Sequence, residues 1–481
     1  MSDHGGRAAA RRARRRSRWR RTVLVTSAVV AFVMVAGTAA AFVVYQQLSG
    51  NIGSEDVDSR LGNRPDKLTK GAINILLIGS DTRAGANSKY GNTSGQRSDT
   101  TILLHLSADR KDAVAISIPR DSWVEIPSCP LSDGGSTEPQ ENRFNAAYTY
   151  GGSACTIKTV EGLTDLRIDH HVVVDFAGFK SVVSTLGGIE VCLPEAVDDP
   201  KSELHLPAGR SVVKGEQALA YVRTRTSMGD GSDLSRIERQ QDFLSAAIQR
   251  MQSTELLLNP KRLYDFLNAA TESITTDPGL DSLHKMYDLA RSAKSLRPNE
   301  ITFLTVPVYD RADGATVAFS EPAASDIFDA LNRDEPLPGS KEAKKLRQMR
   351  VAKSKLTVPP EQIQVRVLNG TKVAGMAGRT SEKLAELGFE VVEVGNAQTQ
   401  DHTETVVEHG ASLGADARTL TQALPGSKNQ TAGGGGDALT LVLGEDFSEQ
   451  VREVYVKGEA DASADEAPSY ESRRASEKVC P

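Results

Sequence analysis

Short apolar runs alternate with stretches of helical periodicity along most of the chain from residue 73 onward. An aliphatic run bounded by turn residues is typical of a buried strand, whereas apolar residues spaced three and four apart are typical of an amphipathic helix. This pattern predicts strands at 73–79, 101–106, 113–118, 172–176, 189–193 and 301–306, and helices at 144–149, 156–164, 177–186, 215–222, 233–252, 260–274, 281–295 and 322–332. We therefore expect an α/β domain over residues 71–335.

A smaller pattern of the same kind follows. Residues 336–360 combine four prolines with a Lys/Arg cluster and are interpreted as a linker. Beyond it, strands are expected at 363–368, 389–394 and 438–443, and helices at 375–387 and near 410–423. These elements predict a small βαβ-type domain over residues 361–447. The polar and acidic residues 448–481 are expected to form a disordered tail.

The longest apolar stretch lies near the N-terminus. Residues 22–45 are 24 positions without a charge, enough for a helix to cross a hydrocarbon core of about 30 Å. Nine arginines precede it within residues 1–21, which retain the N-terminus in the cytoplasm by the positive-inside rule. We expect a transmembrane helix, a linker at 46–70 and extracytoplasmic domains. A signal peptide cleaved near Ala39-Ala40-Ala41 is the alternative, but the stretch exceeds a signal core and continues past these alanines.

Charge and composition narrow the class of protein. Of the 481 residues, 39% are hydrophobic and 25% are charged, which excludes a wholly disordered chain and a multi-span membrane protein. The net charge is −6, but the first 21 residues carry nine arginines and one aspartate, or +8, so the other 460 residues carry −14. An acidic bulk does not indicate a nucleic-acid partner. Richness in Ala, Gly and Arg is typical of a high-GC Gram-positive source.

The chain has four cysteines. Cys129 and Cys155 bracket a loop rich in Gly, Pro and Ser, and a disulfide between them is expected because a crosslink outside the cytoplasm would reduce the entropy of that loop in the unfolded chain. Cys192 lies in an apolar strand and is expected to be a buried thiol, while Cys480 lies in the polar tail.

Acidic and basic residues follow or precede three of the predicted strands. Asp81 comes just after one strand, Arg97 and Asp99 come just before the next, and Arg120 and Asp121 come just after a third. Strand ends of open α/β sheets are where ligands are usually held. No Walker A loop, HExxH or GxSxG occurs, so nucleotide hydrolysis, zinc proteolysis and the usual serine hydrolase arrangement have no support.

Further arginines point to an anionic ligand. Arg223 and Arg225 end one predicted helix, and Arg236 and Arg239 lie three apart on the next. The guanidinium group offers a fixed fork of donors that suits phosphate oxygens and keeps its charge when partly buried. Read singly, each Arg–Asp pair is as compatible with a solvated salt bridge.

A metal ion would reconcile these arginines with the nearby acids. Asp81 and Asp99 would repel a phosphate anion unless a hard cation lay between them. Mg²⁺, with Mn²⁺ as the alternative, commonly takes one or two carboxylates together with substrate phosphates. We therefore expect Asp81 and Asp99 to hold the metal.

The successive motifs resemble those of the LytR-CpsA-Psr family. They occur in the expected order over residues 73 to about 252, as NILLIGSDTR, RSDTTILLHL, SIPRD, RFNAAYTYGG, HHVVVDFAGF, LGGIEVCLP, LPAGRSVVKGEQALAYVRTR and DLSRIERQQ. Residues 363–447, with VRVLNGT, LGFEVVEVG and ALTLVLGEDF, resemble the C-terminal accessory domain of that family.

The resemblance implies a central mixed β-sheet flanked by helices and a magnesium-dependent phosphotransferase of cell-wall assembly. Such an enzyme joins a glycopolymer, carried on polyprenyl pyrophosphate, to peptidoglycan through a phosphodiester; the membrane and other wall-assembly proteins are further partners. The resemblance implies catalytic roles for Arg120, Asp99 and Asp81. It places the pyrophosphate-binding residues at Arg97, Arg120, Arg223 and Arg225, and the final motif at Arg236, Arg239 and Gln240.

Several alternatives remain open at this stage. Asp81, Asp99 and Asp121 are all candidates for a general base. The aliphatic faces of 172–191 and 243–258 suit either a polyprenyl pocket or ordinary core. Two other functions fit the same sequence: a non-catalytic scaffold that binds polyprenyl phosphate, and a membrane-bound transcriptional regulator whose domains face the cytoplasm.

Overall fold

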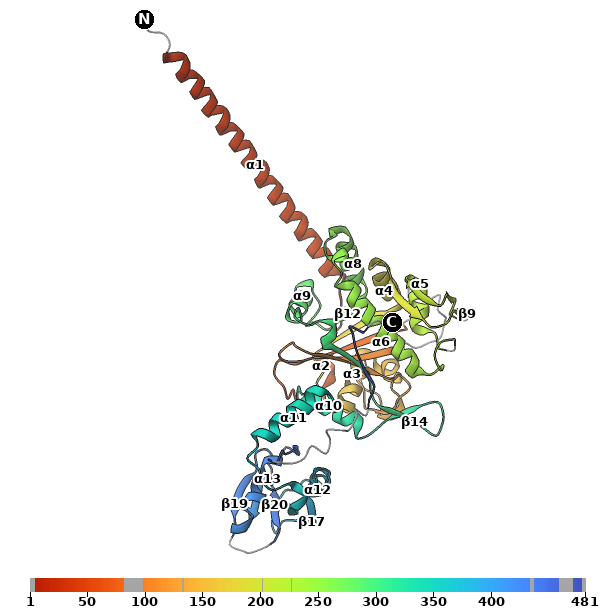
Figure 1. Ribbon diagram of the computed structural model, residues 1–481, viewed down its shortest axis with the longest axis vertical. Helices are drawn as coiled ribbons and strands as arrows, with labels where there is room; N and C mark the ends of the chain where they lie inside the picture. Colours follow the sequence, from red (N-terminus) through yellow and green to blue (C-terminus); the bar gives the residue numbers. More distant parts are fainter. Residues whose placement is uncertain are drawn as a thin grey trace. The chain divides into compact units, whose positions relative to one another are not determined.

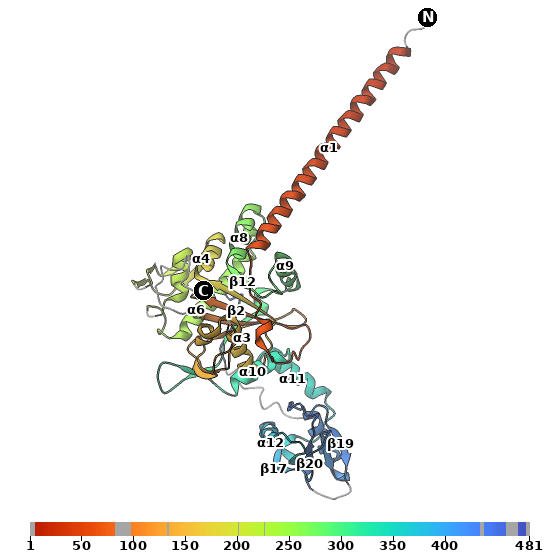
Figure 2. The ribbon, with the colours of Figure 1, turned by 180° about the vertical axis from the view of Figure 1, so that it is seen from behind.

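A computed structural model describes residues 5–81, 98–131, 134–200, 202–225, 227–432, 437–457 and 470–477. The chain forms two compact units (Figures 1 and 2). The first contains Met1–Glu335 together with Ser469–Pro481, and the second contains Pro336–Pro468. Each unit has its own β-sheet with helices, so the predicted α/β class is confirmed.

The first unit is built on an eight-stranded mixed sheet of order β1-β12-β7-β2-β3-β4-β13-β21. Its strands are β1 (Gly53–Ser54), β2 (Ile73–Ser80), β3 (Ser98–Leu106), β4 (Ala113–Ile118), β7 (His170–Asp175), β12 (Ile274–Thr276), β13 (Ile301–Thr305) and β21 (Ser472–Arg474). β2, β3 and β4 are antiparallel neighbours, while β7 lies parallel to β2 and β13 parallel to β4. Every residue of β4 is buried, as its aliphatic sequence predicts.

Helices pack against this sheet (Figure 1), and the first unit also contains short two-stranded sheets. The helices are α2 (Asp58–Leu61), α3 (Ala146–Thr164), α4 (Phe176–Thr185), α5 (Gly215–Arg223), α6 (Asp233–Met251), α7 (Thr254–Leu257), α8 (Pro260–Glu272), α9 (Leu283–Ser292) and α10 (Ala323–Asn332). The smaller pairs are β5 (Trp123–Ile126) with β6 (Gln140–Arg143), β8 (Ile189–Leu193) with β11 (Gly209–Val213), β9 (Val197–Asp199) with β10 (Leu204–Leu206), and β14 (Val308–Asp310) with β15 (Val317–Phe319).

Helix α3 joins two segments that were predicted as separate helices. Its backbone departs from helical geometry at Gly151 and Gly152, and Gly152 has a φ of 61°. A Cβ atom at Gly151 would lie 3.0 Å from the backbone oxygen of Pro130. The kink therefore requires glycine at both positions, the first for space and the second for its positive φ.

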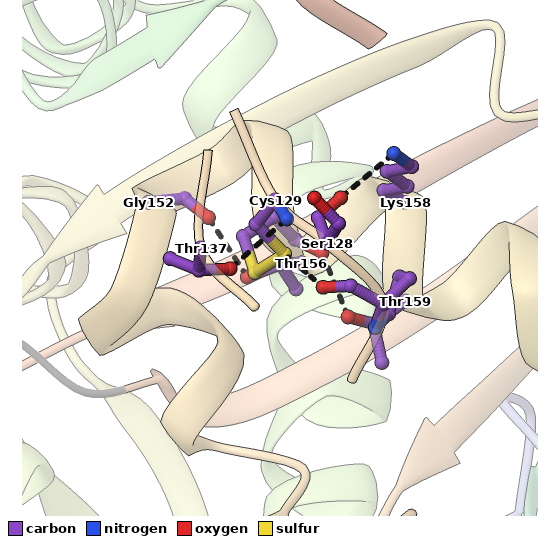
Figure 3. The surroundings of a disulfide bond; sticks show 9 residues. Ser128, Cys129, Thr137, Gly152, Thr156, Lys158 and Thr159 are labelled. Carbon is purple, nitrogen blue, oxygen red and sulfur yellow. Dashed lines mark hydrogen bonds between the residues drawn. A yellow bond between two sulfur atoms is a disulfide. The ribbon is translucent and has the colours of Figure 1, made fainter. Parts of the chain in front are cut away.

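The expected disulfide is confirmed beside this kink. Cys129 and Cys155 are bonded, with Cα atoms 4.9 Å apart, and both are fully buried. The backbone N–H of Cys129 donates to Thr137 Oγ1 at 3.0 Å, and Lys158 Nζ donates to the backbone oxygen of Ser128 at 2.7 Å (Figure 3). The loop before β6 is thus fastened to α3 by covalent and polar contacts.

The prediction for Cys192 is wrong. Cys192 is bonded in a disulfide rather than being a buried thiol. Its strand β8 pairs with β11 in a two-stranded sheet separate from the large one, and Cys192 is half-buried there. Cys480 lies outside the described residues.

Helix α1 (Gly5–Asn51) contains the predicted transmembrane segment. Within it, Val29–Asn51 has a mean hydropathy of 2.0 and is long and apolar enough to cross a membrane. Apolar side chains such as Phe32 and Val35 are exposed, and the helix projects from the rest of the first unit (Figures 1 and 2). The C-terminal end of α1 is packed: Leu48 is buried, and Asn51 Nδ2 donates to Asn268 Oδ1 of α8 at 3.1 Å.

The second unit has a five-stranded sheet of order β17-β16-β20-β18-β19, and it is larger than the expected βαβ unit. Its elements are β16 (Gln364–Asn369), α12 (Met376–Glu386), β17 (Glu390–Asn396), β18 (Val406–His409), α13 (Gly414–Ala423), β19 (Lys428–Thr431) and β20 (Leu439–Leu443). The expected linker contains α11 (Lys341–Lys353). Leu356 and Val358 from that linker pack against the apolar core of this unit.

Residues expected to form a disordered tail are partly ordered. Val454 is buried in the core of the second unit. Further on, β21 pairs antiparallel with β13 in the sheet of the first unit, and Ala475 is fully buried there. Polar composition suggested disorder, but a short edge strand is held by backbone hydrogen bonds and needs few apolar side chains.

Candidate active site

Two of the predicted acids meet at one edge of the large sheet. β2 ends at Ser80, β3 begins at Ser98, and these two residues are partners in the antiparallel register. Asp81 follows the first and Asp99 follows the second, so their side chains come to the same edge. Asp81 is buried, with 9% of its surface exposed.

The end of β4 brings a basic residue to the same edge. β4 is antiparallel to β3, with Ile118 opposite Thr101, so Arg120 and Asp121 emerge beside the start of β3. The backbone N–H of Asn145 donates to the backbone oxygen of Arg120 at 3.1 Å and fixes this turn.

The segment between α5 and α6 completes the site. α5 ends at Arg223, Arg225 follows it, and α6 begins at Asp233. The Ser232 side chain caps α6 by accepting from the backbone N–H of Ser235 at 3.1 Å. This cap places Asp233 in the first helical turn, where an acidic side chain is favoured by the helix dipole.

These elements enclose a cavity of about 540 Å³. It is lined almost entirely by charged and polar side chains, four of them arginines and three of them aspartates: Asp81, Asp99, Arg120, Asp121, Arg143, Asn145, Arg223, Arg225 and Ala315. Six residues predicted from four motifs are therefore brought together: Asp81, Asp99, Arg120, Asp121, Arg223 and Arg225.

Asp233 lies at the centre of the ion pairs that order the arginines. Its Oδ1 is 2.6 Å from Arg236 NH2, 3.3 Å from Arg120 Nε and 3.8 Å from Arg225 NH2. Its side chain is only 13% exposed, so little water competes for these contacts. Three guanidinium groups from different elements are thus held around one carboxylate.

Arg120 is the most completely surrounded of these cations. Its NH1 donates to Asp99 Oδ1 at 2.5 Å, and its Nε is 3.7 Å from Asp121 Oδ2. Burial alone would lower the pKa of Arg120, but the charges of Asp99, Asp233 and Asp121 raise it above its usual value. The guanidinium therefore keeps its charge in a buried position.

For Arg236, burial outweighs the nearby negative charges in setting the pKa. Burial lowers the pKa of Arg236 to about 10, and the Arg120 charge acts in the same direction while Asp233 opposes it. That pKa still leaves the side chain charged at neutral pH. Arg236 does not belong to the cavity lining and reaches the site through Asp233.

Arg223 links the cavity to an apolar region. Its guanidinium carbon lies 4.4 Å from the centre of the Phe176 ring, a favourable cation–π contact. Phe176 belongs to a buried cluster built from α4, α5, α6 and β8, in which Phe243 packs against Phe179 and Tyr221. The aliphatic faces of 172–191 and 243–258 thus contribute to core packing beside the charged cavity.

Arg239 and Gln240 bind backbone rather than lining the cavity. Arg239 donates to the backbone oxygens of Thr224 and Met228, and Gln240 Nε2 donates to the backbone oxygen of Val222 at 3.0 Å. These bonds tie α6 to the end of α5, which carries Arg223 and Arg225. Arg97 lies outside the described residues.

Asp233, Arg143 and Asn145 were not singled out by sequence reasoning as members of the site. Arg143 and Asn145 lie within RFNAAYTYGG, and their NH1 and backbone contacts with Asp121 and Arg120 depend on the folded chain. The sequence did offer one indication, since both residues lie in a motif on which the family resemblance rests.

The carboxylates of the cavity are the kind of oxygen ligand that a hard cation such as Mg²⁺ prefers. Asp81 and Asp99 are both carboxylates on the lining, and Asp99 uses Oδ1 for Arg120. No cluster of three or more His, Cys, Asp or Glu with metal-binding geometry occurs among the described residues. Two carboxylates are the usual protein contribution when phosphate oxygens supply other ligands to Mg²⁺, so the residues fit.

A second group of titratable residues lies at another strand end. Asp277, directly after β12, accepts from His170 Nδ1 at 3.0 Å, from the His171 N–H at 3.1 Å and from the Gly279 N–H at 2.7 Å. Burial alone would raise the pKa of Asp277, but the hydrogen bond and charge of His170 lower it below the ordinary value. These contacts join β12 to β7 and indicate a structural role.

The sequence pattern of the LytR_cpsA_psr family matches residues 32–333. A second pattern, described as LytR cell envelope-related transcriptional attenuator, matches residues 362–447.

Curated relatives include cell-wall proteins of two bacteria. The cell wall biosynthesis protein LcpA of Corynebacterium glutamicum is 29% identical over 417 residues, covering 79% of this chain and 76% of that protein. The polyisoprenyl-teichoic acid–peptidoglycan teichoic acid transferase TagT of Bacillus subtilis is 28% identical over 304 residues, covering 60% of this chain and 88% of TagT. The crystal structure of Bacillus subtilis TagV aligns with a TM-score of 0.42 at 28% identity and covers 55% of this chain and 96% of TagV.

Proposed function

The chain belongs to the LytR_cpsA_psr family, and on this premise we propose that it is a membrane-bound phosphotransferase of cell-wall assembly. It transfers a glycopolymer from a polyprenyl-pyrophosphate carrier to peptidoglycan and joins the two through a phosphodiester. The observation that carries this proposal is the cavity at the sheet edge, where Arg120, Arg223 and Arg225 lie beside Asp81 and Asp99.

Binding of the pyrophosphate follows from the charge of the lining. Arginine forks match pairs of phosphate oxygens, and Arg120, Arg223 and Arg225 reach the cavity from β4 and from the end of α5. Asp233 holds two of the three in place before the substrate enters. Donors fixed in advance stabilise developing charge without reorganising during the reaction.

The reaction exchanges one phosphorus–oxygen bond for another. A hydroxyl oxygen of peptidoglycan attacks the phosphorus that bears the glycan, and a new P–O bond forms. The bond from that phosphorus to the bridging oxygen breaks, and polyprenyl phosphate leaves with the electron pair. The hydroxyl proton passes to a carboxylate of the lining or to water. Because the pyrophosphate already stores the energy for transfer, positioning and charge stabilisation are what the protein supplies.

Asp81 and Asp99 are the residues that would hold Mg²⁺. Bound there, Mg²⁺ would neutralise phosphate charge in a site where carboxylates would otherwise repel it. Arg120 bridges to Asp99 through Oδ1, so it orients this carboxylate toward the cavity.

Two further features agree with a lipid-linked substrate at a membrane: the N-terminal helix and the apolar cluster beside the cavity. Helix α1 anchors the chain, and the nine arginines before residue 22 favour a cytoplasmic N-terminus with both units outside. The Arg223–Phe176 contact joins the charged cavity to the buried apolar cluster of α4, α5 and α6.

A reconstitution experiment tests the function. The full chain in nanodiscs, with a lipid-pyrophosphate glycan donor, peptidoglycan fragments and Mg²⁺, should yield linked product and free polyprenyl phosphate, both measurable by mass spectrometry. Arg120→Ala and Arg223→Ala should each abolish most transfer, while Arg379→Ala, a surface residue of the second unit paired with Glu449, should leave it unchanged. Tight binding of polyprenyl phosphate without any turnover would instead support a non-catalytic carrier.

A further inference from the structure

A second, smaller cavity adjoins the charged one. Its volume is about 200 Å³, and its lining comes from β6 and the first turns of α3: Asn142, Arg143, Asn145, Ala146, Thr149 and Tyr150. Arg143 and Asn145 line both cavities. Whatever occupies the small cavity therefore lies directly beside a ligand of the large one.

The small cavity has a lining of a different chemical kind. Among the described residues, its lining contains two asparagines, a threonine and a tyrosine, with Arg143 as the single charged side chain. The charge of Arg143 is engaged by Asp121, since Arg143 NH1 lies 3.4 Å from Asp121 Oδ1. The lining thus suits a ligand that is uncharged and rich in hydroxyl or amide groups.

Hydrogen bonds hold two of these groups in fixed positions. Asn142 Nδ2 donates to Tyr150 Oη at 2.7 Å, and Asn142 Oδ1 accepts from the Arg143 backbone N–H at 2.8 Å. Because Tyr150 Oη acts as acceptor in this pair, its own hydroxyl can still act as a donor toward a ligand.

The backbone around the cavity is also fixed. Asn145, 7% exposed, donates its backbone N–H to the Arg120 carbonyl at 3.1 Å, so it moves with the strand end that carries Arg120. Tyr150 is followed directly by the glycine kink, which the Cys129–Cys155 bond fastens to the neighbouring loop. A prearranged set of neutral donors and acceptors is the kind of site that selects a ligand by its hydrogen bonds.

We propose that this cavity binds a neutral sugar ring next to the phosphorus at which transfer occurs. The inference rests on the proposed function and extends it, because two sugars flank that phosphorus. One is the first sugar of the donor glycan, which carries the pyrophosphate, and the other is the peptidoglycan sugar whose hydroxyl attacks. Both present hydroxyl groups, and the same amides and Tyr150 hydroxyl recognise either.

The test separates the two sources by measuring KM for donor and for acceptor independently with the full chain in nanodiscs. Tyr150→Phe removes one hydroxyl and keeps the ring, and Asn142→Ala removes the amide that positions it. Loss of one neutral hydrogen bond should raise one of the two KM values about 5- to 10-fold while kcat changes less. The matched control is Tyr287→Phe, an exposed tyrosine on α9, which should change neither KM.

A rise in the acceptor KM alone assigns the cavity to peptidoglycan, and a rise in the donor KM alone assigns it to the donor glycan. Unchanged KM values for both substrates in both variants would overturn the proposal. Equal melting temperatures of Tyr150→Phe and the unmodified chain, measured by circular dichroism, exclude unfolding as the cause of a rise.

A binding measurement keeps this inference separate from the proposed function. Saturation-transfer NMR with N,N′-diacetylchitobiose, a neutral disaccharide, should show contact that weakens in Tyr150→Phe and not in Tyr287→Phe. Sugar contact without transfer would refute the enzyme but retain the site. Transfer without any contact that depends on Tyr150 would refute the site but retain the enzyme.

Discussion

Strand β4 of the first unit and strand β16 of the second both end in a polar turn within a mixed sheet, yet the two turns treat their polar groups differently. At the end of β16, Asn369 Oδ1 accepts from both the N–H and the hydroxyl of Thr371, and Asn369 Nδ2 donates to the backbone oxygen of Val373 at 2.8 Å. This turn satisfies its own donors and acceptors before α12 begins.

The turn after β4 and the start of α6, which lies beside it, leave charged groups incompletely bonded. Arg120 Nε and Arg236 Nε have no hydrogen-bond partner among the described residues, and neither do the two carboxylate oxygens of Asp233, although the ion pairs lie within 4 Å. Buried polar groups are normally satisfied, because leaving one without a bond costs free energy. The two strand ends thus differ in that one satisfies its polar groups within its own turn, whereas the other gathers buried polar atoms without hydrogen-bond partners among the described residues.

The largest effect expected from this contrast is that of Arg120→Ala. Removing a preorganised cation from a transferring phosphoryl group should lower kcat about 10²- to 10³-fold, measured by release of polyprenyl phosphate. Arg120→Lys should recover only part of this, since an ammonium group cannot make the paired contacts of a guanidinium. Transfer at the unmodified rate in Arg120→Ala would place the chemistry elsewhere.

Asp233→Asn should mainly lower the free energy of unfolding, and its effect on transfer should be secondary to that loss. The change preserves shape but removes the negative charge shared by Arg120, Arg225 and Arg236, and breaking a buried ion pair costs about 3 kcal/mol. Chemical denaturation of the first unit should show this loss. Asp265→Asn, whose pair with Lys261 lies on the exposed face of α8, should cost no more than about 0.5 kcal/mol.

Asn369→Ala probes the closed turn of the second unit. It removes an amide with three hydrogen bonds and should lower the free energy of unfolding of that unit by about 2 kcal/mol. Transfer by the folded variant should be unchanged, because the side-chain hydrogen bonds of Asn369 among the described residues stay within its own turn. A selective fall in kcat without loss of stability would show that this turn also meets a substrate.

The smallest effect should be the pH dependence of Asp277→Asn, at a satisfied strand end within the first unit. Since the folded-state pKa of Asp277 is lowered, its contribution to stability is complete above the ordinary value of 3.8 and is lost as the pH falls through the folded-state pKa. The variant should be about 1 kcal/mol less stable than the unmodified chain at pH 7, and the difference should be smaller at pH 3. An equal difference at both pH values would contradict this role.

Most of the elements could be predicted because apolar spacing reports directly on burial. The aliphatic run at 113–118 became the fully buried β4, and the amphipathic stretch at 233–252 became α6. Elements without such a signal were missed: β19 has the exposed sequence KNQT, and α11 has no buried residue. In both cases, backbone hydrogen bonds rather than an apolar face define the element.

The part of the candidate site that lies at strand ends could be predicted from the sequence. Asp81, Asp99 and Arg120 converge because antiparallel neighbours begin and end at one edge. The central place of Asp233 was not predictable, since its contacts with Arg120 and Arg225 join segments that only the folded chain brings together. The small cavity beside Asn145 was missed for the same reason.

The return of the chain at β21 changes what a truncation means. Because Arg473 pairs in register with Phe303 and Ala475 is buried beside β13, the second unit is an insertion in the first, with both of its ends tethered, and not an appendage. Cutting the chain after residue 335 would uncover the edge of β13 and offer its free backbone groups to neighbouring molecules. A shortened protein intended for study should therefore keep residues 470–477, joined by a flexible spacer, instead of ending at the domain boundary.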